Sequence, residues 1–165
     1  DQALEQGLGR VEWPGRLQRL TDGALLRLAP RGSEIWVDGG HNPGAGQVIA
    51  ETMANFEERE PRPLFLITGM INTKDPVGYF EPFGGLAERV FTVPIRGSDA
   101  GLDPLALADD AARAGLEAQP LSTVADALAE IARITEEDEV PPRILIGGSL
   151  YLVGDVLADN GTPPT

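Results

Sequence analysis

The stretch Ile35-Trp36-Val37-Asp38-Gly39-Gly40-His41-Asn42-Pro43 decides how this chain folds. An apolar strand ends here in a carboxylate, two glycines and the only histidine of the protein, and a proline then stands where a helix can begin. In open α/β sheets, ligands bind at the carboxyl ends of strands, where loops lead into helices. The only lysine, Lys74, follows the next apolar strand in the same way. The sequence therefore places its rarest side chains where such folds build their sites.

Strands and helices alternate outward from this stretch. Strands are predicted at 17–20, 24–29, 34–37, 64–68, 90–94, 117–120 and 143–146, and helices at 1–9, 43–58, 75–87 (broken), 103–114, 123–135 and 149–158. The first two strands flank Thr21-Asp22-Gly23, which is a hairpin turn signal. This alternation predicts one α/β domain over residues 1–165, with a mostly parallel sheet, helices on both of its faces and a polar tail at 160–165.

Helical spacing of apolar residues predicts the inner faces of two of these helices. The residues expected to face inward are Val48, Ile49, Met53 and Phe56 in the first helix, and Ala125, Leu128, Ile131 and Ala132 in the second.

The composition excludes several classes of partner. The net charge of −13, from 26 acidic and 13 basic residues, repels nucleic acid and anionic membranes. No apolar run reaches about 18 residues, so no membrane-spanning helix is expected. The absence of cysteine excludes disulfides and thiolate metal sites and fits a cytoplasmic protein. Because the chain opens without methionine on a helix-like segment, we expect a fragment of a longer protein.

Two side chains of the opening stretch are candidates for ligand binding. Asp38 can accept hydrogen bonds from ribose hydroxyls or orient a cation, but it can equally form a local turn or a helix cap. His41 can contact a nucleotide or transfer a proton, or it can be an incidental loop residue, and a lone histidine does not favour a metal. Asn42 suits the N-cap of the next helix. Gly39 and Gly40 allow a ligand to approach the backbone, although a tight turn explains them as well.

Three further candidates lie in other loops. Lys74 can meet a substrate carboxylate, or it can stand beside Asp75 at a helix start. Ser149, after two glycines, can help to bind an anion, or it can be an ordinary N-cap. Arg16, at the end of a Trp-Pro-Gly-Arg stretch, can bind a phosphate with its planar fork, or it can be a surface residue. Since Lys74 is not part of a Gly-Lys-Ser/Thr motif, another domain must supply any P-loop.

Four motifs occur together in a specific order. They are Trp-Pro-Gly-Arg-Leu-Gln at 13–18, Asp-Gly-Gly-His-Asn-Pro at 38–43, Gly-Met-Ile-x-x-Lys-Asp at 69–75 and Gly-Gly-Ser-Leu-Tyr-Leu-Val-Gly at 147–154. In this order they resemble the C-terminal domain of bacterial folylpolyglutamate synthase/dihydrofolate synthase, a family of the Mur ligase superfamily. The resemblance implies a Rossmann-like, three-layer domain of about six strands.

The resemblance also implies a function. The whole enzyme would be an ATP-dependent ligase that adds L-glutamate to dihydropteroate or to a folyl-polyglutamate through an acyl phosphate. This domain would be inactive alone, because an N-terminal P-loop domain binds ATP and holds Mg²⁺. No metal ligand is assigned within this chain. A cytoplasmic monomer is expected.

Residue roles follow from the same resemblance. Arg16 would contact the ATP phosphates, Asp38 the ribose hydroxyls, and His41 and Asn42 the nucleotide region. Lys74 and Ser149 align with positions that hold the carboxylates of the incoming amino acid in related ligases. His41 and Lys74 are the candidate catalytic residues.

Two alternatives stay open. One is a different Mur-type ligase, acting on cell-wall precursors. The other is a stand-alone Rossmann-like nucleotide-binding module, against which the lack of a Gly-x-Gly-x-x-Gly fingerprint counts.

Overall fold

The computed structural model describes residues 17–96 and 98–161. Within these ranges one sheet has the strand order β1-β2-β6-β3-β4-β5. The strands are β1 (Gln18–Leu20), β2 (Glu34–Asp38), β3 (Leu64–Thr68), β4 (Arg89–Thr92), β5 (Ala118–Pro120) and β6 (Arg143–Gly147). Only the pair β1–β2 is antiparallel among the described strands. The predicted mostly parallel sheet is confirmed.

Helices follow most of the strands. They are α2 (Ala24–Leu28), α3 (Pro43–Arg59), α4 (Pro76–Phe80), α5 (Pro104–Arg113), α6 (Val124–Ile134) and α7 (Leu150–Asn160), and a 3₁₀ helix, η1 (Glu81–Phe83), extends α4. Among the described residues, no helix is both long enough and apolar enough to cross a bilayer.

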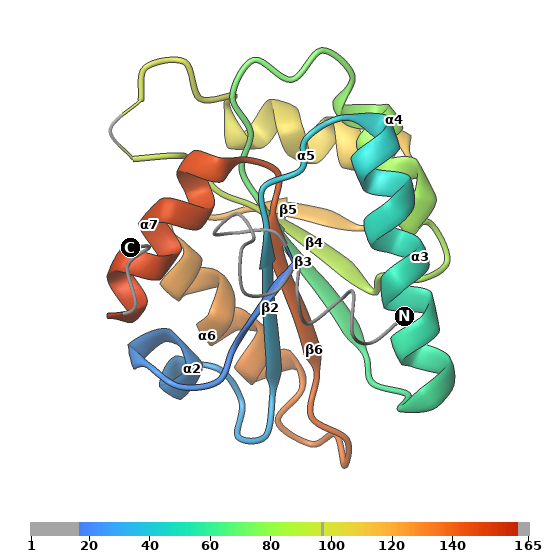
Figure 1. Ribbon diagram of the computed structural model, residues 1–165, viewed down its shortest axis with the longest axis vertical. Helices are drawn as coiled ribbons and strands as arrows, with labels where there is room; N and C mark the ends of the chain where they lie inside the picture. Colours follow the sequence, from blue (N-terminus) through green and yellow to red (C-terminus); the bar gives the residue numbers. More distant parts are fainter. Residues whose placement is uncertain (1–16, 97, 162–165) are drawn as a thin grey trace, which may run out of the picture.

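Alternate residues of each strand face opposite sides of the sheet and build two cores. In β2, Ile35 and Val37 pack toward α2, α6 and α7, whereas Trp36 packs toward α3, α4 and α5. Phe65 and Leu66 of β3 divide between the same two layers. Figure 1 shows α3 and α4 on one side of the sheet and α2, α6 and α7 on the other. The three-layer α/β architecture therefore agrees with the prediction.

Polar side chains cap the helices at several predicted positions. The Oδ1 atom of Asn42 accepts a hydrogen bond from the Ala45 N–H at 2.8 Å, and Pro43 takes the first position of α3. Asp103 caps α5 by accepting from a backbone N–H of its first turn at 3.2 Å. The Asn42 cap fixes the residue at which α3 begins. It therefore also fixes where the preceding loop, which carries His41, ends.

The predicted hairpin over 17–29 is wrong, because its second half forms the helix α2. The first turn of α2 is capped from far along the chain: the Leu25 N–H donates to Asn160 Oδ1 at 2.9 Å, and Asn160 Nδ2 donates to the Asp22 carbonyl at 2.8 Å. Gly23 takes a φ of 118° beside this amide, where a Cβ would overlap it. Since the capping residue lies 135 positions away from Leu25, no local pattern reveals it.

Helix α7 is longer than predicted and ends at Asn160. This asparagine is 2% exposed and belongs to the packed interior, so it does not begin a polar tail. The remaining tail residues 162–165 and the helix expected at 1–9 lie outside the described residues.

The buried faces of two helices differ in detail from the prediction. On α6, Ala125 is exposed, whereas Val124 and Ala127 are buried. On α3, Val48 is 63% exposed, whereas Ile49 is buried. Both differences have one cause. Adjacent helical residues lie roughly 100° apart, so an apolar residue can flank the buried stripe without joining the core.

Candidate functional site

The carboxyl ends of the parallel strands form one row across the sheet. Asp38 of β2 pairs in register with Gly147 of β6, Gly147 with Thr68 of β3, and Thr68 with Thr92 of β4. The loops that follow β2, β6 and β3 therefore leave the sheet side by side. From these neighbouring ends, β2 leads to α3 on one face and β6 leads to α7 on the other. Such a switch point is where open α/β sheets bind ligands.

Asp38 is the best anchored of the predicted site residues. It is 7% exposed, and its Oδ2 accepts a hydrogen bond from the Gly40 N–H at 2.7 Å. This bond forms the local turn that the sequence analysis gave as the alternative to ligand binding. Its Oδ1 accepts from the Leu17 N–H at 2.8 Å. Leu17 directly follows Arg16, which lies outside the described residues. Each carboxylate oxygen has a second lone pair, so Asp38 can still accept a bond from a ligand.

In the rest of the β2–α3 loop, Gly39 is buried and Gly40 partly buried, and only the last two residues are open to solvent. His41 and Asn42 are both exposed, and Asn42 is engaged in capping α3. Gly39 has no positive φ, and its need for glycine comes from Leu150 of α7, whose side chain occupies the space of a Cβ. The glycine therefore lets the loop after β2 and the first turn of α7 come together.

Lys74 lies exposed in the loop after β3. This loop is braced by an antiparallel bridge between Ile71 and Gly101, and Asp75 ends it by capping α4 through the Gly78 N–H at 2.9 Å. Lys74 forms no ion pair with any residue in the described ranges, Asp75 included. Its charge is therefore available to a ligand.

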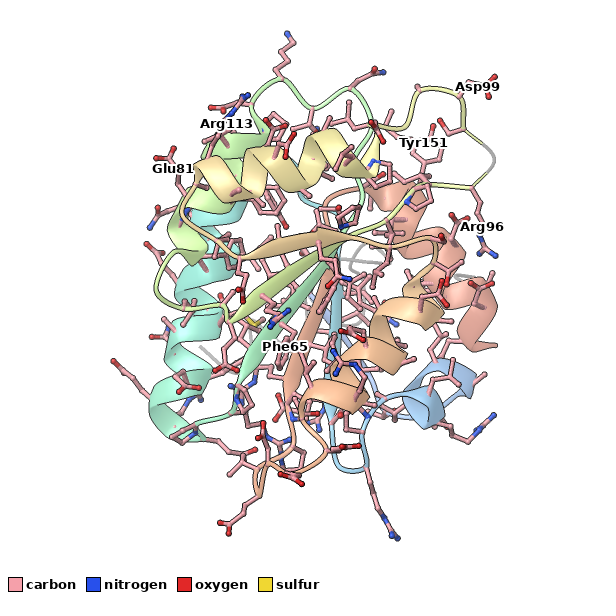
Figure 2. The ribbon with its side chains drawn as sticks, turned by 180° about the vertical axis from the view of Figure 1, so that it is seen from behind. Phe65, Glu81, Arg96, Asp99, Arg113 and Tyr151 are labelled. Atoms are coloured by element: carbon pink, nitrogen blue, oxygen red, sulfur yellow. The ribbon has the colours of Figure 1, made fainter. Side chains whose placement is uncertain are left out.

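Ser149 is buried at the start of α7, where it is 6% exposed. Its Oγ accepts from the Tyr151 N–H at 3.0 Å, so it is the N-cap of the helix. The hydroxyl proton remains free to donate. Gly148, with a φ of 105°, turns the chain before it. Figure 2 shows Tyr151 at the same end of the molecule as Asp99 of the β4–α5 loop.

Two hydroxyls at this edge were missed by the sequence analysis. The Oγ1 atom of Thr73 is buried and has no hydrogen-bond partner among the described residues. Tyr79 of α4 is 1% exposed, and its hydroxyl lies 3.5 Å from the position that a Cβ of Gly147 would take. Burial, together with the nearby Asp38 carboxylate, raises the pKa of Tyr79 above its ordinary value. Thr73 lies in the loop before α4 and Tyr79 in an apolar stretch, and neither hydroxyl belongs to a pattern that signals a site.

The described residues contain no group of three or more histidine, aspartate or glutamate side chains placed to hold a metal ion. The edge offers hydroxyls, the Asp38 carboxylate, one imidazole and one ammonium group. This donor set fits an organic ligand with oxygen atoms and negative charge better than a divalent cation.

The opposite, amino-end edge of the sheet holds an ion-pair cluster, which we call the amino-edge clasp: Arg143, Glu34, Arg62 and Glu60. Arg143 Nε donates to Glu34 Oε1 at 2.8 Å, and Arg62 Nε lies 2.7 Å from Glu60 Oε1 and 3.4 Å from Glu34 Oε2. The Arg143 side chain is 3% exposed. A hollow of about 740 Å³ opens beside it, lined by residues including Arg62 and Glu57. None of the predicted site residues in the described ranges lines this hollow.

The fold is Rossmann-like, and the row of strand ends is the place where such folds bind ligands. No family model matches the chain. The chain is 30% identical over 156 residues to the folylpolyglutamate synthase of Lacticaseibacillus casei, an alignment that covers 94% of this chain and 31% of that protein.

Solved structures give the same picture for the fold. The Mycobacterium tuberculosis folylpolyglutamate synthase complexed with ADP and AMPPCP matches with a TM-score of 0.76 at 24% identity, over 99% of this chain and 36% of that one. The Yersinia pestis bifunctional folylpolyglutamate synthase/dihydrofolate synthase complexed with AMPPNP and Mn ion matches with a TM-score of 0.65 at 20% identity, over 96% and 34%.

The chain thus spans about a third of the length of each of these three proteins. The predicted resemblance to the C-terminal region of folylpolyglutamate synthases is confirmed over nearly the whole chain.

Proposed function

We propose that this chain is the C-terminal domain of an ATP-dependent ligase that adds L-glutamate to dihydropteroate or to a (tetrahydro)folyl-polyglutamate. The observation that carries the proposal is the row of strand ends, which brings the loops at 38–42, 69–75 and 147–149 to one edge. These are the loops whose motifs resemble the folylpolyglutamate synthases, the class to which the sequence relative belongs.

The proposed reaction has two steps. A carboxylate oxygen of the folate or pteroate substrate takes the γ-phosphoryl group of ATP, which releases ADP. The glutamate amine then attacks the carbonyl carbon of this acyl phosphate, inorganic phosphate leaves, and the nitrogen loses a proton to give the amide. Phosphoryl transfer of this kind depends chiefly on positioning and charge neutralisation. The chain contributes these at the edge of its sheet.

The surroundings of the described site residues support a role for each of them. Asp38 accepts from the ribose hydroxyls with its remaining lone pairs, and the exposed His41 lies beside the nucleotide at the domain cleft. Lys74, whose charge has no partner in the described ranges, meets a carboxylate of the incoming glutamate. Ser149 donates its free proton to the same amino acid. Arg16, which lies outside the described residues, contacts the ATP phosphates in this proposal.

The remaining parts of the site belong to a preceding domain in this proposal. A P-loop domain of the same protein binds the phosphates, and its Mg²⁺ neutralises their charge when bound. No residue of this chain is assigned to that ion, since the described residues hold no suitable cluster. The ligase is proposed to be a cytoplasmic monomer, and the charge of −13 disfavours nucleic acid as a partner.

A chimera tests the ligase proposal. This chain replaces the matching third of the L. casei enzyme, and transfer of labelled glutamate to a folate acceptor is measured. We expect turnover from the chimera and none from the 165-residue chain alone. Turnover by the isolated chain contradicts the proposal. So does a folded chimera that binds ATP, glutamate and the folate acceptor without turnover.

An ATP titration tests the nucleotide half of the site directly. Backbone amide shifts of the ¹⁵N-labelled chain are followed by NMR up to several millimolar ATP. We expect the shifts to concentrate at residues 38–42 and their neighbours at the carboxyl edge. Residues of the amino-edge clasp serve as the internal control and should not move.

A further inference from the structure

The loop that carries Lys74 is joined to both of its neighbouring loops at the carboxyl edge. At its start, a Cβ at Gly148 would come within 2.8 Å of the Gly69 carbonyl oxygen, so the chain after β3 lies close against the β6–α7 loop. Further along, Ile71 forms an antiparallel bridge with Gly101 of the β4–α5 loop. A backbone hydrogen bond of 2.8 Å joins the same two loops beside this bridge. The first half of the Lys74 loop is therefore fixed in place.

Asn72 follows the bridge in a left-handed backbone conformation, with a φ of 50°. Among the described residues, Leu17 is the only other non-glycine with a positive φ. This conformation is unfavourable for most side chains because the Cβ comes close to backbone atoms, and asparagine tolerates it better than most residues other than glycine. The chain therefore turns sharply at Asn72 in a way that most residue types would not adopt unaided.

After this turn, the Thr73 hydroxyl is buried and the Lys74 side chain is exposed. The Thr73 Oγ1 atom has no hydrogen-bond partner among the described residues. Burying an unpaired hydroxyl is unfavourable, so the surroundings impose this arrangement on the loop. Asp75 then ends the loop by capping α4 through the Gly78 N–H at 2.9 Å. Lys74 thus lies between two fixed points, the turn at Asn72 and the cap at Asp75.

Two unfavourable features therefore stand directly before Lys74, the left-handed backbone of Asn72 and the unpaired hydroxyl of Thr73. Strain of this kind persists only where the surrounding structure imposes it, and it concentrates at functional sites. Here the bridge at Ile71 and the cap at Asp75 hold the loop on either side. A different φ at residue 72 would rotate the peptide that follows, and with it the direction in which Lys74 leaves the loop.

We propose that Asn72 is a positioning residue, whose left-handed backbone directs Lys74 toward a carboxylate of the incoming amino acid. This inference rests on the proposed function, because it takes glutamate as the ligand of Lys74. It assigns the role to the backbone conformation of Asn72 and not to its amide group. Asn72 itself contacts no ligand in this proposal, but it decides where the ammonium group lies.

Selective labelling gives a direct readout in the 165-residue chain, because Lys74 is its only lysine. One backbone ¹⁵N–¹H signal of labelled lysine then reports the conformation of the loop by NMR. Asn72→Val should shift this signal much further than Asn72→Gly does, since glycine adopts the left-handed conformation without strain. An unmoved signal in Asn72→Val overturns the inference without any assay of activity.

Kinetics of the L. casei chimera test the consequence for glutamate. Asn72→Val should raise the KM for glutamate about 10-fold and leave kcat within about 2-fold, because a displaced ammonium group binds the carboxylate less well. Asn72→Ala, with an unbranched side chain, should give a smaller rise of the same kind. Asn72→Gly should restore the KM to near that of the unsubstituted chimera.

Gly115→Val is the matched control for backbone strain. Gly115 has a φ of 93° in the exposed turn before β5, at the amino edge, and no described atom lies within 4 Å of a Cβ built there. This variant should lower the melting temperature about as much as Asn72→Val does and leave the KM for glutamate unchanged. In a Lys74→Ala background, Asn72→Val should cause no further rise in the KM, because it acts through Lys74.

Each contrary outcome is distinct. An unchanged KM in both Asn72→Val and Asn72→Ala overturns this inference and leaves the ligase proposal standing. An equal rise in Asn72→Gly also overturns it, because the amide group would then matter and not the backbone. So does an equal rise in Gly115→Val, or a further rise in the Lys74→Ala background. Absence of turnover in the folded, unsubstituted chimera overturns the ligase proposal, and this inference with it.

Discussion

Charged side chains are paired at the amino edge of the sheet, whereas the lysine at its carboxyl edge has no ion pair among the described residues. At the amino edge, the buried guanidinium of Arg143 meets Glu34, and Arg62 bridges Glu34 and Glu60. At the carboxyl edge, Lys74 is exposed and has no ion pair in the described ranges. Charges that are paired and buried fix the fold, whereas a charge left open at a switch point is available to a ligand. The two kinds of charged residue should therefore respond differently to substitution.

The largest expected effect comes from breaking the amino-edge clasp. Replacing Arg143 with methionine keeps an unbranched side chain but leaves the carboxylate of Glu34 buried without its main partner. We expect the free energy of unfolding to fall by about 3–5 kcal/mol, measured by urea denaturation. The matched control is Arg133→Met on α6, which breaks a solvent-screened pair with Glu130 and should change stability far less than Arg143→Met. Similar losses for the two variants would refute the contrast.

The second prediction concerns acid stability. Burial raises the pKa of Glu34, but the hydrogen bonds from Arg143 and Trp36 and the nearby charges of Arg143 and Arg62 outweigh it and lower the pKa from 4.5 to about 2. Glu34 therefore binds its proton more weakly when folded. Its stabilisation is complete above pH 4.5 and is lost as the pH falls toward 2. We expect it to contribute on the order of 2–3 kcal/mol across this window.

Two variants check that the acid loss belongs to Glu34. Denaturation is repeated between pH 5 and pH 2.5 for Glu34→Gln and for Glu130→Gln. Glu34→Gln should be less stable at neutral pH and should lose this part of the pH dependence, whereas Glu130→Gln should keep it. An unchanged acid slope in Glu34→Gln would assign the loss to other carboxylates.

The smallest effect on stability is expected at the carboxyl edge. Lys74→Ala removes an exposed charge without breaking an ion pair of the described residues, so the free energy of unfolding should change by less than about 0.5 kcal/mol. Glutamate transfer by the chimera that carries this substitution should nevertheless be impaired. The main kinetic change should be a higher KM for glutamate. Lys74→Arg, which keeps the charge, should restore part of the transfer. A large loss of stability in Lys74→Ala would make the residue structural.

The sequence predicted those elements whose signals are local. The buried runs at 64–68 and 143–146 became the parallel strands β3 and β6, and Asn42 and Asp103 cap the helices that they precede. The helix α2 was missed because its cap, Asn160, comes from the far end of the chain. Local propensity decides an element only where no distant side chain overrides it.

The site was predictable in position but not in full composition. The register of β2, β6 and β3 brings the loops of Asp38, Ser149 and Lys74 to one edge, as their places after strands indicated. The position of Tyr79 at this edge was not foreseen, because it depends on how α4 packs against Gly46 of α3 and not on a motif. The roles assigned to these side chains stay predictions until ligands are tested.

The position of β6 in the sheet sets a constraint on synthesis. It is the last of the described strands along the chain, yet it lies between β2 and β3. About 75 residues separate the end of β3 from the start of β6, which corresponds to roughly 4–15 s of translation at bacterial and eukaryotic rates. During this interval the nascent chain exposes two unpaired strand edges with apolar side chains, a template for intermolecular pairing. A ribosome-bound chaperone that shields the growing chain would therefore matter most between the emergence of β3 and that of β6.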